Sequence, residues 1–140
     1  MSQSAEVHPG SRGVHEQILD DLRRPTRELR RLAPPVWQEF GLLHRAAMEA
    51  GELSTATKEL IALAIAVVEG CDGCIASHAR SAARAGATPS EVAEALGVAL
   101  LMGGGPASVH APRAWEAFSE FSSDPNPPSE IPQRQVPVSR

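Results

Sequence analysis

Residues 59–78 decide the fold of this chain, and they read ELIALAIAVVEGCDGCIASH. The run from Leu60 to Val68 is apolar on every side, so it can form a helix only if it is buried all round, within its own domain or against another subunit. Gly70 predicts the end of this helix. If a second helix begins at Cys71 and folds back, the stretch forms an antiparallel helical hairpin.

Four polar groups fall on one side of the predicted hairpin. Counted from Gly70 at ~1.5 Å per residue, Glu59 lies roughly 16 Å and His78 roughly 12 Å from the bend, so these two side chains are about level. On the second helix Cys71, Cys74 and His78 occupy positions i, i+3 and i+7, which form a single stripe. A buried carboxylate needs a partner, and this geometry offers His78 to Glu59.

The composition and net charge of the chain limit which fold classes and functions fit the sequence. The chain has 140 residues, of which 42% are hydrophobic and only 4% aromatic. With abundant alanine, this mix favours close-packed helices over a sheet and predicts an all-α domain. The formal net charge of −4 argues against general nucleic-acid binding.

The sequence also bears on the compartment. No apolar run reaches the roughly 18 residues that cross a bilayer, and residues 1–13 lack the apolar region of a signal peptide. We therefore expect a cytoplasmic protein with no membrane partner. In a reducing compartment two cysteines at CxxC spacing indicate a redox-active or metal-bound pair rather than a structural staple.

The remaining chain predicts one helical domain, residues 14–122, between disordered ends at residues 1–13 and 123–140. A first amphipathic helix begins at Val14, Pro25 should end or kink it, and another turn or two follows to Leu32. Pro35 suits the first position of the next helix, which ends near Gly51. Its apolar face consists of Val36, Phe40, Leu43 and Ala47.

Turn and cap signals mark the later helices. Ser54 is the expected N-cap of the central helix, and Gly86 the residue that ends the second hairpin helix. The sequence TPSE from Thr88 predicts a capping box. The segment 103–106, GGGP, predicts a sharp corner or a close approach of helices. His110 suits either a helix cap or a neighbour of the active site.

A basic cluster lies in the first helix, and we interpret it as a solvated helix face rather than an anion or nucleic-acid patch. The reason is that acidic residues stand at i,i+3 and i,i+4 spacing, where they can pair with the arginines. The cluster comprises Arg23, Arg24, Arg27, Arg30 and Arg31, and the acidic residues are Asp20, Asp21 and Glu28.

A CxxC pair at a helix start has clear chemistry. The helix N-terminus favours thiolate, and the i,i+3 spacing lets the two sulfurs form a disulfide. His78 can take the proton of a cysteine, and Glu59 can orient the imidazole or complete a proton path.

The pattern Glu-x11-Cys-x2-Cys-x3-His, with flanking LSTATKELI, AGATPSEV and MGGGP segments, resembles the AhpD-like alkylhydroperoxidases of the carboxymuconolactone decarboxylase superfamily. The resemblance spans residues 29–121. It implies that Cys74 attacks a hydroperoxide and becomes a sulfenic acid, that Cys71 is the resolving cysteine or a proton donor, and that His78 and Glu59 relay protons. It also implies an all-helical bundle that assembles as a homotrimer or homohexamer. The resulting disulfide would be reduced by a dithiol donor, which in the family can be a lipoyl protein; no other cofactor is expected.

One position departs from the family pattern. Well-characterised members carry histidine immediately before the second cysteine, where this chain has Gly73. A different thiol-disulfide reaction, or weak peroxidase activity, is therefore a possible outcome.

Four alternatives to a redox enzyme remain open. The cysteines can be small buried hydrophobes, or Cys71, Cys74 and His78, with Glu59 or another histidine, can hold zinc. The chain can also be an oligomeric scaffold with a vestigial redox pair. A carboxymuconolactone-type decarboxylase is the least favoured reading, because such decarboxylases generally lack the CxxC pair.

Overall fold

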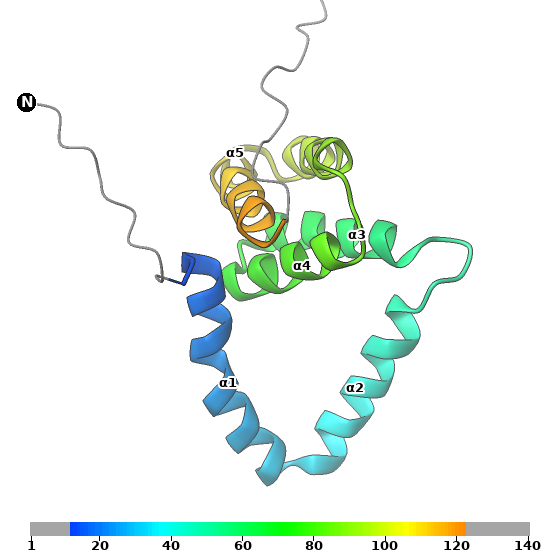
Figure 1. Cartoon of the computed structure of the whole chain (residues 1–140), viewed down its shortest axis with the longest axis vertical. Helices are drawn as coiled ribbons and strands as arrows, with labels where there is room; N and C mark the ends of the chain where they lie inside the picture. Colours follow the sequence, from blue (N-terminus) through cyan, green and yellow to red (C-terminus); the bar gives the residue numbers. More distant parts are fainter. Residues whose placement is uncertain (1–11, 123–140) are drawn as a thin grey trace, which may run out of the picture.

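The structure, a computed structural model, describes residues 12–122 as five α-helices with no strand in that range (Figure 1). The all-α expectation is confirmed. The expected disordered ends, residues 1–13 and 123–140, lie outside the described residues except for Arg12 and Gly13. The helices are α1 (Val14–Leu32), α2 (Pro34–Met48), α3 (Thr55–Glu69), α4 (Asp72–Arg84) and α5 (Pro89–Phe121).

Helices α3, α4 and α5 form the body of the molecule and enclose the core (Figure 1). The largest fully buried side chains are Phe118, Leu63, Ile75, Val67 and Val92. Between them lie alanines from α4 and α5, which let the helix backbones approach closely. The many alanines and few aromatic residues therefore allow the helices of the body to pack closely together.

The cap signals of the sequence appear where they are expected. The Ser54 side chain accepts a hydrogen bond from the Thr57 backbone N–H at 3.1 Å. The capping box at α5 is complete, because Glu91 N–H donates to the Thr88 hydroxyl and Thr88 N–H donates to the Glu91 carboxylate. Gly70 follows α3 in the left-handed conformation, with φ of 67°, so the predicted hairpin turn is confirmed.

The glycine-rich segment makes a corner inside α5. Gly104 has φ of 61° and ψ of −140°, which are not helical, and two helical segments meet there. At Gly103 an added Cβ would lie 2.7 Å from the Cβ of Ala107 and 3.2 Å from Cγ2 of Val68. Both parts of the expectation, a corner and a close helix approach, are thus confirmed.

Helix α5 is also long and apolar enough to cross a membrane, by length and composition alone. The corner at Gly104 divides it, and α5 supplies core residues such as Leu96 and Phe118 to the body. Only 22% of its most apolar 18-residue window is buried in the single chain, so much of the apolar surface of α5 is left uncovered.

Helices α1 and α2 form an arm that leaves the body as an open V (Figure 1). Of the two outcomes expected at Pro25, an end or a kink, the end does not occur, because α1 continues through Pro25 to Leu32. Water can replace the one backbone hydrogen bond that proline removes. Helix α2 begins at Pro34, one residue before the expected first position, and ends at Met48. Within residues 12–122 nothing buries a residue of α2.

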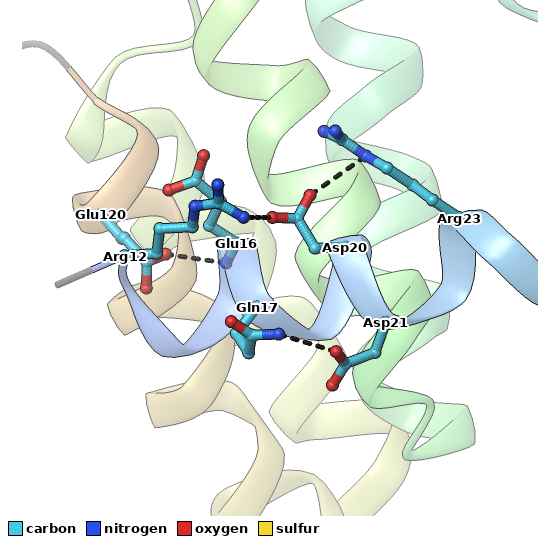
Figure 2. Close-up of polar contacts among 7 residues, drawn as sticks. All are labelled: Arg12, Glu16, Gln17, Asp20, Asp21, Arg23 and Glu120. Carbon is cyan, nitrogen blue, oxygen red and sulfur yellow. Dashed lines mark hydrogen bonds and ion pairs between the residues drawn. The ribbon is translucent and has the colours of Figure 1, made fainter.

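The start of α1 is attached to the last turns of α5 through Glu120 (Figure 2). The Glu120 carboxylate accepts hydrogen bonds from the backbone N–H of Glu16 at 2.9 Å and of His15 at 3.2 Å. It also lies 2.9 Å from Nδ1 of the buried His15. A side chain from another helix thus fills the role of an N-cap.

Candidate functional site

The two cysteines lie at the turn between α3 and α4. Cys71 is the N-cap of α4, and its Sγ accepts a hydrogen bond from the Cys74 backbone N–H at 3.3 Å. The sulfurs of Cys71 and Cys74 form a disulfide, with their Cα atoms 5.2 Å apart. In the reduced state the same N–H group and the helix N-terminus would stabilise a thiolate at Cys71.

Glu59 and His78 meet across the hairpin, as the count from Gly70 predicts. Oε2 of Glu59 lies 2.8 Å from Nδ1 of His78. The Glu59 side chain is 6% exposed and the His78 side chain 24% exposed. The carboxylate therefore fixes one ring nitrogen of His78, and the other nitrogen remains available for a proton transfer.

The site opens toward solvent at the second cysteine. Cys74 is exposed, whereas Cys71 is half-buried. His78 follows Cys74 by one helical turn on α4, so the imidazole and the sulfur share a face. A small oxidant or a dithiol would therefore reach Cys74 before Cys71.

Two residues of α5 contact the same turn, and sequence reasoning left one open and missed the other. An added Cβ on Gly70 would lie 3.0 Å from Nε2 of His110, so His110 is a neighbour of the site rather than a helix cap. Nη1 of Arg113 lies 3.3 Å from Oδ1 of Asp72. The i,i+3 spacing of His110 and Arg113 places both on one face of α5, but it does not tell which part of the molecule that face meets.

Gly73, between the cysteines, faces helix α1. An added Cβ would lie 3.2 Å from Cδ1 of Leu22, which is tighter than ordinary van der Waals contact. A histidine here would require Leu22 to move.

The basic cluster of α1 pairs only in part. Arg23 lies 3.1 Å from Asp20 and Arg24 lies 2.8 Å from Glu28, as expected for a solvated helix face (Figure 2 shows Arg23). Asp21 instead accepts a hydrogen bond from Gln17 at 2.7 Å. Among residues 12–122, Arg27 and Arg30 form no ion pair, and Arg30 lies 5.6 Å from the ring centre of Trp37.

The possible metal ligands of the described residues do not form a metal site. In the described part of the chain no group of three His, Cys, Asp or Glu side chains is placed to hold a metal ion. Cys71 and Cys74 are joined to each other, and His78 is held by Glu59. The arrangement is that of a dithiol–disulfide pair beside an acid–imidazole pair.

A model of the carboxymuconolactone decarboxylase family matches residues 34–117. The chain belongs to this family. The match covers α2, α3, α4 and most of α5, and so contains the hairpin with Glu59, Cys71, Cys74 and His78. With the CxxC pair, the chain is an AhpD-like member of the superfamily.

Solved structures of the same family and an uncharacterized relative are similar to this chain. A carboxymuconolactone decarboxylase family protein from Legionella pneumophila is 41% identical, with a TM-score of 0.75 over 77% of this chain and 96% of that one. A family member from Thermotoga maritima, described as a protein with a suggested role in an antioxidative response, is 30% identical, with a TM-score of 0.66 over 75% of this chain and 89% of that one. An uncharacterized protein of Cupriavidus necator is 36% identical over 75% of this chain and 93% of its own length.

Proposed function

We propose that the protein is a thiol-dependent oxidoreductase that reduces hydroperoxides through Cys71 and Cys74, with His78 and Glu59 as its proton relay. One observation carries the proposal: a disulfide-bonded CxxC pair begins α4 one turn from an imidazole that a buried carboxylate holds at 2.8 Å. The suggested antioxidative role of the Thermotoga maritima relative supports the same chemistry.

The proposed cycle balances as two half-reactions. The Cys74 thiolate attacks the terminal oxygen of the hydroperoxide, so that an S–O bond forms, the O–O bond breaks and an alcohol leaves with a proton from His78. Cys71 then attacks the sulfenic acid of Cys74, which forms the disulfide and releases water. A dithiol donor, such as a lipoyl protein, supplies two electrons and two protons to restore the thiols.

Stopped-flow thiol oxidation tests the roles of the two cysteines. We expect Cys71→Ser to be oxidised once at Cys74, giving a sulfenic acid that dimedone traps, and then to stop. We expect Cys74→Ser to leave hydroperoxide unconsumed. Consumption by Cys74→Ser at the wild-type rate would contradict the assignment, and unreactive thiols in the wild type would favour the scaffold alternative. Stoichiometric zinc in protein purified without added metal would favour the zinc alternative.

The relay has its own test. Glu59→Gln keeps the shape of the side chain and removes its charge, so we expect the oxidation rate to fall by about 10²-fold. Glu116→Gln makes the same change at an exposed position of α5 and should leave the rate unchanged. If Glu59→Gln and the wild type are oxidised at equal rates and have equal stability, Glu59 takes no part in proton transfer. Its charge would then act only on the N-terminal end of α3.

We also propose that the chain assembles with itself, as a homotrimer or homohexamer. Apolar side chains of α3 and α5 line an open groove of about 440 Å³, among them Ile61, Ile65, Val68, Val98 and Met102. Ile65 is 57% exposed in the single chain. A helix that is apolar on every side is normally buried, so this exposed face is a candidate contact with another subunit. Sedimentation should give three or six times the 14.8 kDa of one chain; a monomer at micromolar concentration would contradict assembly.

The proposed compartment is the cytoplasm. A dithiol that must be reduced after each turnover needs a compartment that supplies thiol reductants. Redox-sensitive alkylation in intact cells should find Cys71 and Cys74 mostly reduced, and oxidised after a hydroperoxide pulse. A permanently oxidised pair would contradict this placement.

A further inference from the structure

A pocket lined by arginines lies between α1 and α4. Its volume is about 370 Å³, within the range of small-molecule sites. Arg23, Arg27 and Arg30 lie at positions i, i+4 and i+7 and so share one face of α1. The polar side chains that line this arginine pocket are those of Arg23, Thr26, Arg27, Arg30, Ser77 and Arg80.

The positive charge of the arginine pocket is only partly compensated. Arg23 pairs with Asp20 at 3.1 Å, but within residues 12–122 neither Arg27 nor Arg30 nor Arg80 forms an ion pair. Nε of Arg80 is buried and has no hydrogen-bond partner in the same range. A buried donor without an acceptor is costly, so an oxyanion at this position would be stabilised.

The electrostatics of Arg80 point the same way. Burial lowers the pKa of Arg80, as do the positive charges of Arg84 and Arg23, and the carboxylates of Asp20 and Glu16 offset this effect only in part. The guanidinium remains charged at neutral pH because its ordinary pKa is so high. The pocket therefore holds excess positive charge in a partly desolvated place.

The pocket adjoins the dithiol. Ser77, in its wall, follows exposed Cys74 by three residues on α4. Leu22, in the opposite wall, is the α1 residue that an added Cβ on Gly73 would meet at 3.2 Å. Arg80 lies six residues beyond Cys74, which corresponds to roughly 9 Å along the helix axis.

We propose that the arginine pocket is an oxyanion-binding subsite, and that the preferred hydroperoxide carries a carboxylate or phosphate group. The group would bind Arg80 and Arg27 while the hydroperoxide end reaches Cys74. Guanidinium groups bind both oxyanions through paired N–H donors, which gives geometry as well as affinity. The inference rests on the proposed function for its reaction, but binding at the pocket is independent of it.

Direct binding decides whether the pocket takes an oxyanion. Benzoate or inorganic phosphate is titrated into the oxidised full-length protein while the Nε–H signals of its arginines are followed by NMR. We expect saturable shifts at Arg80 with the anions and none with neutral benzamide. Tighter binding of phosphate than of benzoate would assign the head group as a phosphate, and the reverse order would assign a carboxylate. If neither anion gives a saturable shift, the proposal is wrong. The same result would be found if an acidic group of a second copy filled the pocket, and it would overturn the proposal then too.

Kinetics then connect the pocket to the dithiol. Wild-type thiols are oxidised by para-carboxycumene hydroperoxide and by its neutral methyl ester in stopped flow. We expect the carboxylate to react about tenfold faster, a ratio that one charge-assisted hydrogen bond provides. Arg80→Gln and Arg27→Gln should each reduce the ratio of the carboxylate rate to the ester rate. Arg24→Gln, which removes an exposed arginine paired with Glu28, should keep the preference.

The outcomes separate the two proposals. If neither hydroperoxide oxidises the wild-type thiols, the proposed function is wrong, and anion binding by NMR still decides about the pocket. If the wild type reacts with both hydroperoxides at equal rates, the pocket has no part in substrate choice and the proposed preference is wrong. Arg27 is exposed, so Arg27→Gln keeps the test valid should Arg80→Gln fail to fold.

Discussion

The body of α3, α4 and α5 and the arm of α1 and α2 are both built of helices with apolar faces, yet they bury those faces very differently. The body encloses a continuous core around Leu63, Val67 and Phe118. Helix α1 buries only His15 and Leu19, and α2 buries nothing within residues 12–122. The dithiol and the Glu59–His78 pair belong to the body, so a continuous core holds the reacting groups. Most of the apolar surface of the arm is left uncovered.

The largest effect should come from the centre of the body. Leu63→Ala removes a fully buried side chain and should lower the free energy of unfolding by about 2–5 kcal/mol, because a cavity remains. Urea denaturation measures the loss. The matched change in the arm, Leu43→Ala at an exposed side chain, should cost little at high dilution.

Protein concentration sharpens this contrast. If the arm is covered by another copy, the effect of Leu43→Ala should grow with protein concentration, since assembly contributes to stability. The effect of Leu63→Ala should stay large at every concentration. Equal losses for the two variants at high dilution would contradict the division into body and arm.

The next effect concerns the turn that carries Cys71. Gly70→Ala places a Cβ on a residue with φ of 67° and 3.0 Å from Nε2 of His110. We expect a loss of about 1–2 kcal/mol from the backbone conformation, plus the displacement of His110. Thermal unfolding and the rate of thiol oxidation should both change, because the turn positions the first cysteine.

Gly86 provides the control for this turn. It also has positive φ, 84°, but an added Cβ would meet nothing within 4 Å. Gly86→Ala should therefore lose only the stability that an alanine at positive φ costs, and it should leave the rate of thiol oxidation unchanged. A smaller loss for Gly70→Ala than for Gly86→Ala would show that the contact with His110 is unimportant.

The body was predictable from sequence to the extent that its signals are local. Gly70, Ser54 and the capping box at Thr88 each act within a few residues, and counting along two antiparallel helices brought Glu59 level with His78. The contact of His110 with Gly70 joins residues 40 positions apart. A single sequence does not show which residues of α5 lie against this turn.

The arm shows where local signals fail. Helical spacing predicted the apolar face of α2, but it could not tell whether this chain or another would cover Val36 and Phe40, which are exposed here. Pro25 predicted an end or a kink, and α1 does not end there. The pocket was missed for the same reason, since charge spacing within α1 said nothing of Arg80 across from it.

The smallest effect concerns the junction of arm and body at Glu120. Burial alone would raise the pKa of Glu120, but the backbone N–H of Glu16 and contacts with His15 outweigh it and lower the pKa below its ordinary value. The carboxylate therefore stabilises the folded state at neutral pH, and this contribution is lost as the pH falls through the folded pKa.

Glu120→Gln removes this charge, and at neutral pH we expect it to cost about 1 kcal/mol or less, as for a lost N-cap. Amide hydrogen exchange should become faster at the start of α1, where His15 and Glu16 donate to the carboxylate, while α4 keeps its protection. The difference between wild type and Glu120→Gln should shrink as the pH falls, because protonation removes the charge from the wild type too. Glu116→Gln, at an exposed position without this contact, should show no such pH dependence. If α1 and α4 lost protection together, the arm and the body would unfold as one cooperative unit. The prediction that the arm opens independently of the body would then be wrong.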